Sequence, residues 1–230
     1  MKNFFSSSDS LPLLGFILFF LVPVMKHCKN GSGDSEIDRT TANNKLFNEN
    51  ITLAVSEYNL GHLKQALLYY DKAIELFPAS PLVLCNRSII KNALGDYRGG
   101  LADLNKAAQL APNEPIVYSN RGGTYNNLGL YQYALQDINK AIELKANNPI
   151  DYYNRGSSQN GLLQYAAAIK DFDTAISLGL EKGEVYLSRG CSKHLLKRYK
   201  EATEDYDQAI ALGCQDAVLF RVKAIMKQSF

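Results

Sequence analysis

The feature that most constrains this chain is a repeat with a period of 34 residues. Five series of residues return at this interval without an insertion or a deletion. They are Leu60, Leu94, Leu128, Leu162 and Leu196; Tyr97, Tyr131, Tyr165 and Tyr199; Ala73, Ala107, Ala141, Ala175 and Ala209; Leu76, Leu110, Leu144, Leu178 and Leu212; and Asp103, Asp137, Asp171 and Asp205. Series in one register indicate an array of repeated units, none of which can bury its apolar face alone. The units are therefore predicted to stack around a shared core.

Each unit reads as two short amphipathic helices. In the unit 115–148, the apolar residues between Ala134 and Leu144 recur at steps of three and four, which is the helical period. Leu128-Gly129 is the predicted turn between the two helices. Pro149 marks the next unit, because proline fits the first turn of a helix and cannot continue one. No segment sustains the alternation of a strand, so the sequence predicts an all-α fold.

These units resemble the tetratricopeptide repeat, a helix–turn–helix family with the same period. The residues that match its pattern in the third unit are Tyr118, Gly122, Leu128, Gly129, Tyr131, Ala134, Ile138 and Ala141. Leu163 and Lys197 replace the turn glycine in the last two units. The resemblance covers residues 47–214. It implies a right-handed superhelix of helix–turn–helix repeats (an α-solenoid), whose first helices line a concave groove.

The chain divides by composition and repeat. The predicted parts are a polar N-terminal stretch (1–10), an apolar segment (11–25), a linker (26–46), five repeats (47–80, 81–114, 115–148, 149–182 and 183–216) and a C-terminal capping helix (217–230). The polar residues 29–44 cannot bury enough apolar surface to offset chain entropy, so the linker is expected to be a flexible tether. Residues 217–229 look like one more first helix. They end in basic and polar residues, as a cap should.

The uncharged run from Leu11 to Met25 predicts a membrane partner through residues 11–25. Its fifteen residues fall between a signal sequence and a full membrane crossing. The expected localisation is a single-pass anchor with a soluble repeat domain, and the flanking basic residues favour the cytoplasmic side only slightly. A lipoprotein signal ending at Cys28, a cleaved export signal and a cytosolic chain remain as alternatives.

Two rows of polar residues fall on positions that line the groove in the family. Counted from the start of each repeat, the sixth positions hold Thr52, Asn86, Asn120, Asn154 and Ser188, and the twelfth hold Tyr58, Asn92, Asn126, Asn160 and His194. An asparagine amide can both donate to and accept from a peptide backbone. The rows resemble the asparagine ladder of O-linked N-acetylglucosamine transferases, which grips extended peptides. The predicted site is Asn86, Asn92, Asn120, Asn126, Asn127, Asn154, Asn160, Tyr153, Ser188 and His194. Alternatively, Asn-Arg-Gly is simply a favoured sequence for the first helix.

Two charged rows share the period. The arginines are Arg87, Arg121, Arg155 and Arg189, and the aspartates are the series given above. They are interpreted as salt bridges between helices, with a charged strip for a partner as the alternative. The Lys and Arg residues with which chaperone-binding members of the family hold a terminal carboxylate are missing. Binding to chaperone tails is therefore not expected.

Composition and motifs argue against several classes of function. A formal net charge of +2 is too small to indicate nucleic acid as a partner. The three histidines are not paired with a nucleophile or a metal set, and no nucleotide-binding or hydrolase motif occurs. We therefore expect a non-catalytic scaffold with no cofactor and no small-molecule substrate, whose groove binds an extended peptide or protein segment. The alternative is a structural subunit of a membrane-associated complex that uses the convex face or the repeat edges.

Overall fold

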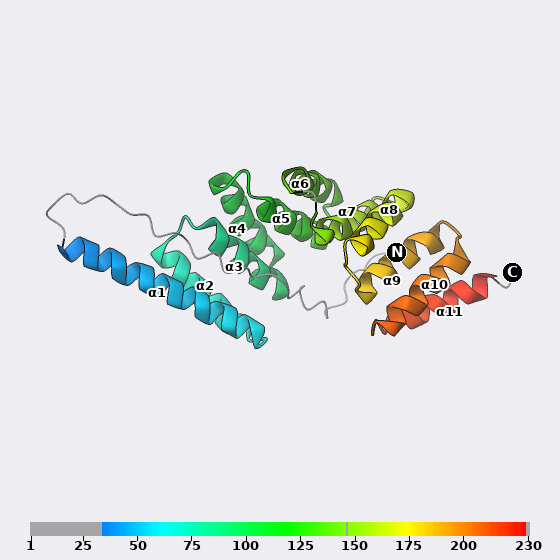
Figure 1. Ribbon diagram of the computed structural model, residues 1–230, viewed down its shortest axis with the longest axis horizontal. Coiled ribbons are helices and arrows are strands. Elements are labelled where there is room, and N and C mark those ends of the chain that lie inside the picture. Colours follow the sequence, from blue (N-terminus) through cyan, green and yellow to red (C-terminus); the bar gives the residue numbers. More distant parts are fainter. Residues whose placement is uncertain (1–33, 146, 229–230) are drawn as a thin grey trace.

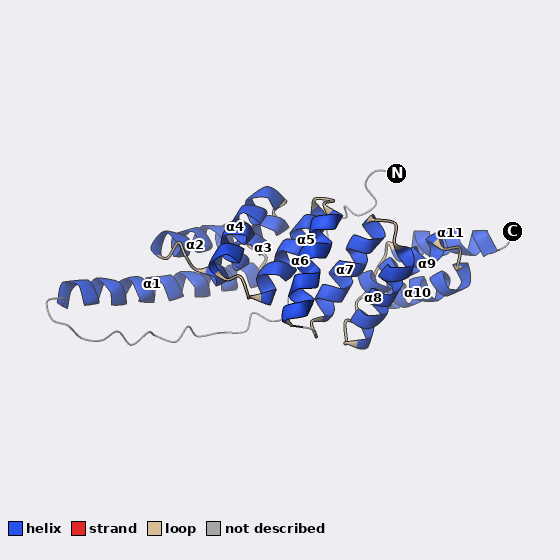
Figure 2. Ribbon diagram, turned by 90° about the horizontal axis from the view of Figure 1, so that it is seen from above, coloured by secondary structure: helices blue, strands red, loops and turns tan. Residues whose placement is uncertain are grey.

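The computed structural model describes residues 34–145 and 147–228, and this part of the chain contains eleven α-helices and no strand. The helices are α1 (Asp34–Asn59), α2 (Leu63–Leu76), α3 (Pro81–Ala93), α4 (Tyr97–Leu110), α5 (Pro115–Asn127), α6 (Tyr131–Leu144), α7 (Pro149–Gly161), α8 (Tyr165–Ser177), α9 (Gly183–Leu195), α10 (Tyr199–Ala211) and α11 (Ala217–Gln228). They form an elongated stack with α1 and α11 at opposite ends (Figure 1). Short loops join neighbouring helices (Figure 2). The prediction of an all-α solenoid is confirmed.

The helices alternate between two roles. Helices A (α1, α3, α5, α7 and α9) each pair with the following helix B (α2, α4, α6, α8 and α10). Successive helices A also contact one another from α3 to α9, whereas no comparable contacts join successive helices B in the described chain. A stack whose helices A lie closer together than its helices B curves with the helices A inside. The helices A therefore line the concave side.

Small residues allow the two helices of a repeat to approach closely. Gly122 in α5 faces α6, and a Cβ atom at this position would lie 2.5 Å from Cγ1 of Ile138 and 3.3 Å from the carbonyl oxygen of Ala134. Ala134, Ile138 and Ala141 are fully buried beneath it. The glycine and alanine series of the sequence thus set the distance between the helices, and larger side chains fill the space between repeats.

The turns between helices A and B need a left-handed residue. Gly95 and Gly129 adopt φ of 82° and 71°, which glycine reaches without strain. Leu163 and Lys197 occupy the same turn position in the last two repeats with φ of 63°. The sequence departs from the family pattern at these two residues, but the turn keeps its shape.

The start of α1 corrects the predicted linker of residues 26–46. The helix begins at Asp34, inside the stretch that was expected to be a flexible tether. Its later part is held by packing, since Ala54 and Tyr58 are buried and Phe47 makes an edge-to-face contact with Phe77. Once such a segment is fixed, extending the helix costs little per residue. No proline interrupts residues 34–46.

The membrane prediction is also corrected. None of the helices in the described ranges has the length and apolar character needed to cross a bilayer. This finding contradicts the expected single-pass membrane localisation. The apolar segment 11–25, on which that expectation rested, lies outside the described residues, as does the polar stretch 1–10.

Candidate functional site

The twelfth-position row holds successive helices A together. Nδ2 of Asn92 in α3 donates to Oγ1 of Thr124 in α5 at 2.7 Å. Asn126 in α5 repeats this link with α7: its Nδ2 donates to the carbonyl oxygen of Asn154 at 2.8 Å, and its Oδ1 lies 2.7 Å from Oγ of Ser158.

The next step of the row joins α7 to α9. Oγ of Ser192 lies 2.8 Å from Oδ1 of Asn160, and both residues are buried. The row predicted to face a ligand is thus largely engaged within the fold, because each of its asparagines bonds to the next helix A. The hydroxyl series Thr124, Ser158 and Ser192 follows the 34-residue period, so equivalent links join successive helices A.

The sixth-position row is different, because two of its amides have no partner. Nδ2 of Asn120 is buried and makes no hydrogen bond within the described protein. The side chain of Asn154 lies against α5, and its Nδ2 would be 3.6 Å from a Cβ atom placed on Gly123. Gly123 is less than one turn from Asn120 on α5, so the two amides are neighbours across adjacent repeats. A buried donor without a partner is costly and calls for an explanation.

Tyrosines flank the two ends of this row. The hydroxyl of Tyr70 makes a hydrogen bond with Asn86, and burial raises the pKa of Tyr70 to about 12. Tyr153 packs against Phe172, with ring centroids 5.9 Å apart, and burial raises its pKa despite a hydrogen bond with Ser188. The predicted residues Asn86 and Ser188 thus each lie beside a tyrosine hydroxyl, whereas Nδ2 of Asn120 has no hydrogen-bond partner among the described residues.

A buried acid lies beside the free amides. The Oγ of Ser119, next to Asn120 in α5, donates to Oδ1 of Asp151 in α7. Asp151 is buried, and this burial raises the pKa of its carboxyl although hydrogen bonds with Ser119 and Asn148 oppose the shift. Asp151 is not among the residues predicted from the sequence. The equivalent residues in three other repeats, Val83, Val117 and Val185, are apolar and buried. An acid at this repeat position was therefore recognisable in the sequence as an exception.

The remaining predicted residues are Asn127 and His194. Asn127 is exposed at the end of α5. His194 in α9 meets Tyr199 edge-to-face with centroids 5.1 Å apart. Burial, with Lys223 and Lys227 nearby, lowers the pKa of His194. The structure therefore does not gather the ten predicted residues into one site.

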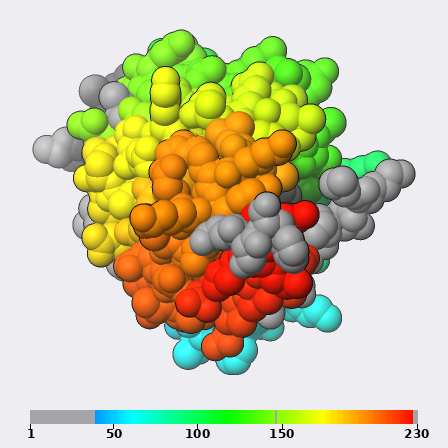
Figure 3. Space-filling view, turned by 90° about the vertical axis from the view of Figure 1, so that its right-hand side faces the viewer, coloured from blue at the N-terminus to red at the C-terminus, as the bar shows by residue number. Residues whose placement is uncertain are grey.

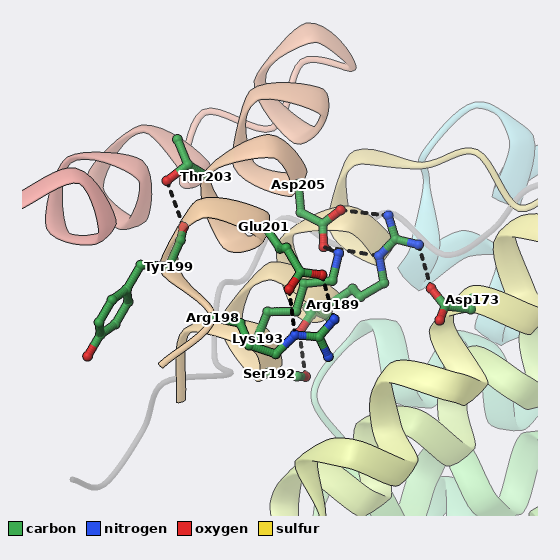
Figure 4. Close-up of polar contacts among 10 residues, drawn as sticks. Asp173, Arg189, Ser192, Lys193, Arg198, Tyr199, Glu201, Thr203 and Asp205 are labelled. Atoms are coloured by element: carbon green, nitrogen blue, oxygen red, sulfur yellow. Dashed lines mark hydrogen bonds and ion pairs between the residues drawn. The ribbon is translucent and has the colours of Figure 1, made fainter. Parts of the chain in front are cut away.

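The arginine and aspartate rows form clamps between helices. Arg189 of α9 makes a two-pronged contact with Asp205 of α10, from Nε at 3.0 Å and from a terminal nitrogen at 2.6 Å (Figure 4). Its other terminal nitrogen reaches back to Asp173 of α8 at 2.6 Å. The two-pronged contact recurs at Arg87, Arg121 and Arg155, and the partner in the preceding repeat is Asp71 for Arg87 but the amide oxygen of an asparagine, Asn105 or Asn139, for the other two. These rows are structural salt bridges, because each arginine joins its own repeat to the preceding one.

The chemistry available on this face is recognition by hydrogen bonds. The free amides of Asn120 and Asn154 offer donors and acceptors at neighbouring positions. The three described cysteines, Cys85, Cys191 and Cys214, have pKa values raised by burial, which disfavours the thiolate. Within the described residues, no cluster of His, Cys, Asp or Glu has the makings of a metal site.

Comparison with known proteins supports the repeat assignment. The model of the tetratricopeptide repeat family matches residues 50–80, 116–148 and 183–212. The fold is similar to that of the MamA 41-end structure from Desulfovibrio magneticus RS-1, with a TM-score of 0.63 and 20% identity over 73% of this chain and 95% of that chain. It is also similar to TTC0263, a thermophilic TPR protein in Thermus thermophilus, with a TM-score of 0.66 and 18% identity over 78% and 99% of the two chains.

A third similar structure is YrrB, described as a TPR protein with an unusual peptide-binding site. Its TM-score is 0.60, with 18% identity over 82% of this chain and 98% of that chain. Comparison with curated proteins finds no match. The tetratricopeptide repeat model thus matches the first, third and fifth repeated units of this chain, and the fold of the stack is similar to these three solved structures.

Proposed function

We propose that this protein is a non-catalytic interaction scaffold whose helix A side binds an extended peptide or protein segment. The observation that carries the proposal is the pair of free amides at Asn120 and Asn154. Asn120 keeps a buried donor without a partner in the described protein. Both side chains are half-buried, and a bound main chain would supply the missing acceptor once the Asn120 amide turns out of its buried position.

The geometry favours an extended ligand over a compact one. Asn120 and Asn154 come from successive helices A, so the amides repeat along the stack. An asparagine amide can donate a hydrogen bond to a peptide carbonyl and accept one from a peptide N–H. It therefore suits a ligand that is recognised through its main chain. The peptide-binding site described for YrrB is a further reason to consider this class of ligand, although the similarity to YrrB concerns the fold.

The experiment is a selection of peptides from a random displayed library on the purified full chain, followed by calorimetric titration. Removing both amides, as Asn120→Ala with Asn154→Ala, should weaken a selected peptide by roughly 10- to 100-fold, since each lost hydrogen bond is worth about 0.5–1.5 kcal/mol. The double variant should keep its helix content.

The matched control also removes two amides, but from exposed positions on helices B: Gln109→Ala in α4 and Gln136→Ala in α6. This control should bind like the wild type. If both double variants bind equally well, the free amides do not contact the ligand and the proposed site is wrong.

A further inference from the structure

Helix α11 is apolar on both of its sides. Ala217 and Ala224 are fully buried against the rest of the stack, and Phe220 packs with them. The opposite side, here called the α11 outer face, consists of Val218, Leu219, Val222 and Met226, which are 46–60% exposed. Figure 3 looks onto this end of the molecule, with α11 in red. The outer side of α11 is therefore apolar. This differs from the predicted capping helix, because the capping helix of a solenoid should have a polar outer side.

An ion pair shows which repeat position each residue of α11 occupies. Arg221 pairs with Asp207 of α10, as Arg189 pairs with Asp173 of α8. The two arginines are 32 residues apart, whereas α9 and α11 begin 34 residues apart, so α11 is a sixth helix A that is turned about its axis by two residues relative to α9. Val222 then corresponds to Gly190, which lies against its own helix B: a Cβ atom there would be 2.7 Å from Tyr206. The α11 outer face is thus the side that a following helix would cover.

The other end of the stack has a matching exposed side. Leu46 and Leu53 of α1 and Leu60, directly after this helix, recur every seven residues and are 44–65% exposed, and they are called here the α1 leucine stripe. Leu53 stands 34 residues before Arg87, whose terminal nitrogen reaches back to Asp71 on the preceding helix B. The α1 leucine stripe is therefore the side that a preceding helix would cover.

The charges beside the two surfaces are opposite. Glu49 and Glu57 alternate with the leucines of the α1 stripe at steps of three and four. Each has one exposed basic neighbour, Lys45 for Glu49 and His62 for Glu57. On α11, Lys223 stands between Leu219 and Met226 at the same steps, and the helix has no acidic residue. The α11 outer face extends over about two and a half helical turns and the α1 leucine stripe over about four, so the first would cover only part of the second.

We propose that these proteins associate head to tail, with the α11 outer face of one copy packed on the α1 leucine stripe of a second copy. Apolar surface leaves water at both helices, and Lys223 meets carboxylates. A symmetric pair of α11 helices would oppose lysine to lysine, and a symmetric pair of α1 helices would oppose glutamate to glutamate. The contact joins two different surfaces, so it leaves one of each open and can propagate.

The test is sedimentation velocity of the full chain from about 1 to about 300 µM, a range suited to a small interface. The wild type should change from single chains to larger species as concentration rises. Leu53→Asn and Val222→Asn each place a polar group in one surface and should each stay monomeric. Leu68→Asn changes an equally exposed leucine on α2 and should associate like the wild type. Circular dichroism checks that all variants keep their helix content.

Mixing the two blocked variants separates the possible arrangements. Each keeps one intact surface, so an equimolar mixture of Leu53→Asn and Val222→Asn should form a one-to-one dimer and nothing larger. If Leu53→Asn still associates alone, the contact is symmetric through α11 and the proposal is wrong. If the wild type remains monomeric throughout, these surfaces do not join copies. A loss of thermal stability in Val222→Asn in that case would show that part of the same chain covers α11.

Discussion

The clamp between Arg155 and Asp171 allows a quantitative prediction. Arg155 approaches both oxygens of the carboxylate, at 2.8 and 2.7 Å, and its other terminal nitrogen lies 3.1 Å from Oδ1 of Asn139 in the preceding repeat. The Asp171 side chain is only 8% exposed, and that of Arg155 is 24% exposed. Hydrogen bonds to Asp171 raise the pKa of Arg155. Arg155→Met would leave a buried carboxylate without its cation, a change that costs about 3–5 kcal/mol in other proteins. Because some water reaches the pair, we expect about 3 kcal/mol.

Arg189 provides the matched comparison. It makes the same clamp with Asp205, but Nζ of Lys193 also lies 2.8 Å from Asp205. Arg189→Met keeps one cation on the carboxylate, so it should cost about 1–2 kcal/mol. The free energy of unfolding is measured by urea denaturation followed by circular dichroism. Because repeat arrays can unfold in parts, the midpoints are compared together with the slopes.

Two outcomes bear on the reasoning. Adding Asp171→Leu to Arg155→Met should recover part of the loss, since the unpaired carboxylate is then gone. Equal and small effects of Arg155→Met and Arg189→Met, below about 1 kcal/mol, would show instead that the clamps behave as ordinary exposed ion pairs. The claim that they join the repeats would then be refuted.

Three further predictions concern single positions. Gly122→Ala should destabilise by about 1–3 kcal/mol because its Cβ would meet Ile138, whereas Gly123→Ala should be neutral or stabilising by up to about 1 kcal/mol; thermal melting compares the two. Leu163→Gly should relieve the left-handed turn and raise stability by up to about 1 kcal/mol, because its side chain is 71% exposed and little packing is lost; a drop in the urea midpoint would contradict this. Asp151 has a raised pKa in the folded protein, so it binds its proton more tightly there and lowers stability as pH rises above about 4. Asp151→Asn should therefore raise the Tm at pH 7 and lose this advantage towards pH 4; an advantage that is constant with pH would argue against a titrating Asp151.

The fold was predictable because the constant 34-residue period aligns equivalent positions of all the repeats. The alanine, leucine and tyrosine series mark the faces that pack, and the chain keeps the 34-residue spacing even where Leu163 replaces the turn glycine. The start of α1 was not predictable in this way. Its polar composition suggested a tether, but composition does not report that a neighbouring segment is already fixed by packing.

The candidate site was predictable in part. The period identified the asparagines, but it did not say which amides the protein uses for itself. Asn126 and Asn154 look alike in the sequence. Only the position of Ser158 in three dimensions shows that Asn126 is engaged between two helices, whereas the side chain of Asn154 makes no hydrogen bond within the described residues. The outer side of α11 was missed for a related reason, because a two-residue shift of register changes which residues face outward.

The most direct test of the proposed function is to observe the side-chain amides of Asn120 and Asn154 while a selected peptide binds. In a titration of isotope-labelled protein followed by two-dimensional nuclear magnetic resonance, these two amide signals should shift with the binding curve. Those of Gln109 and Gln136 should stay in place. A peptide that binds tightly while the signals of Asn120 and Asn154 do not move would show that the ligand uses another surface.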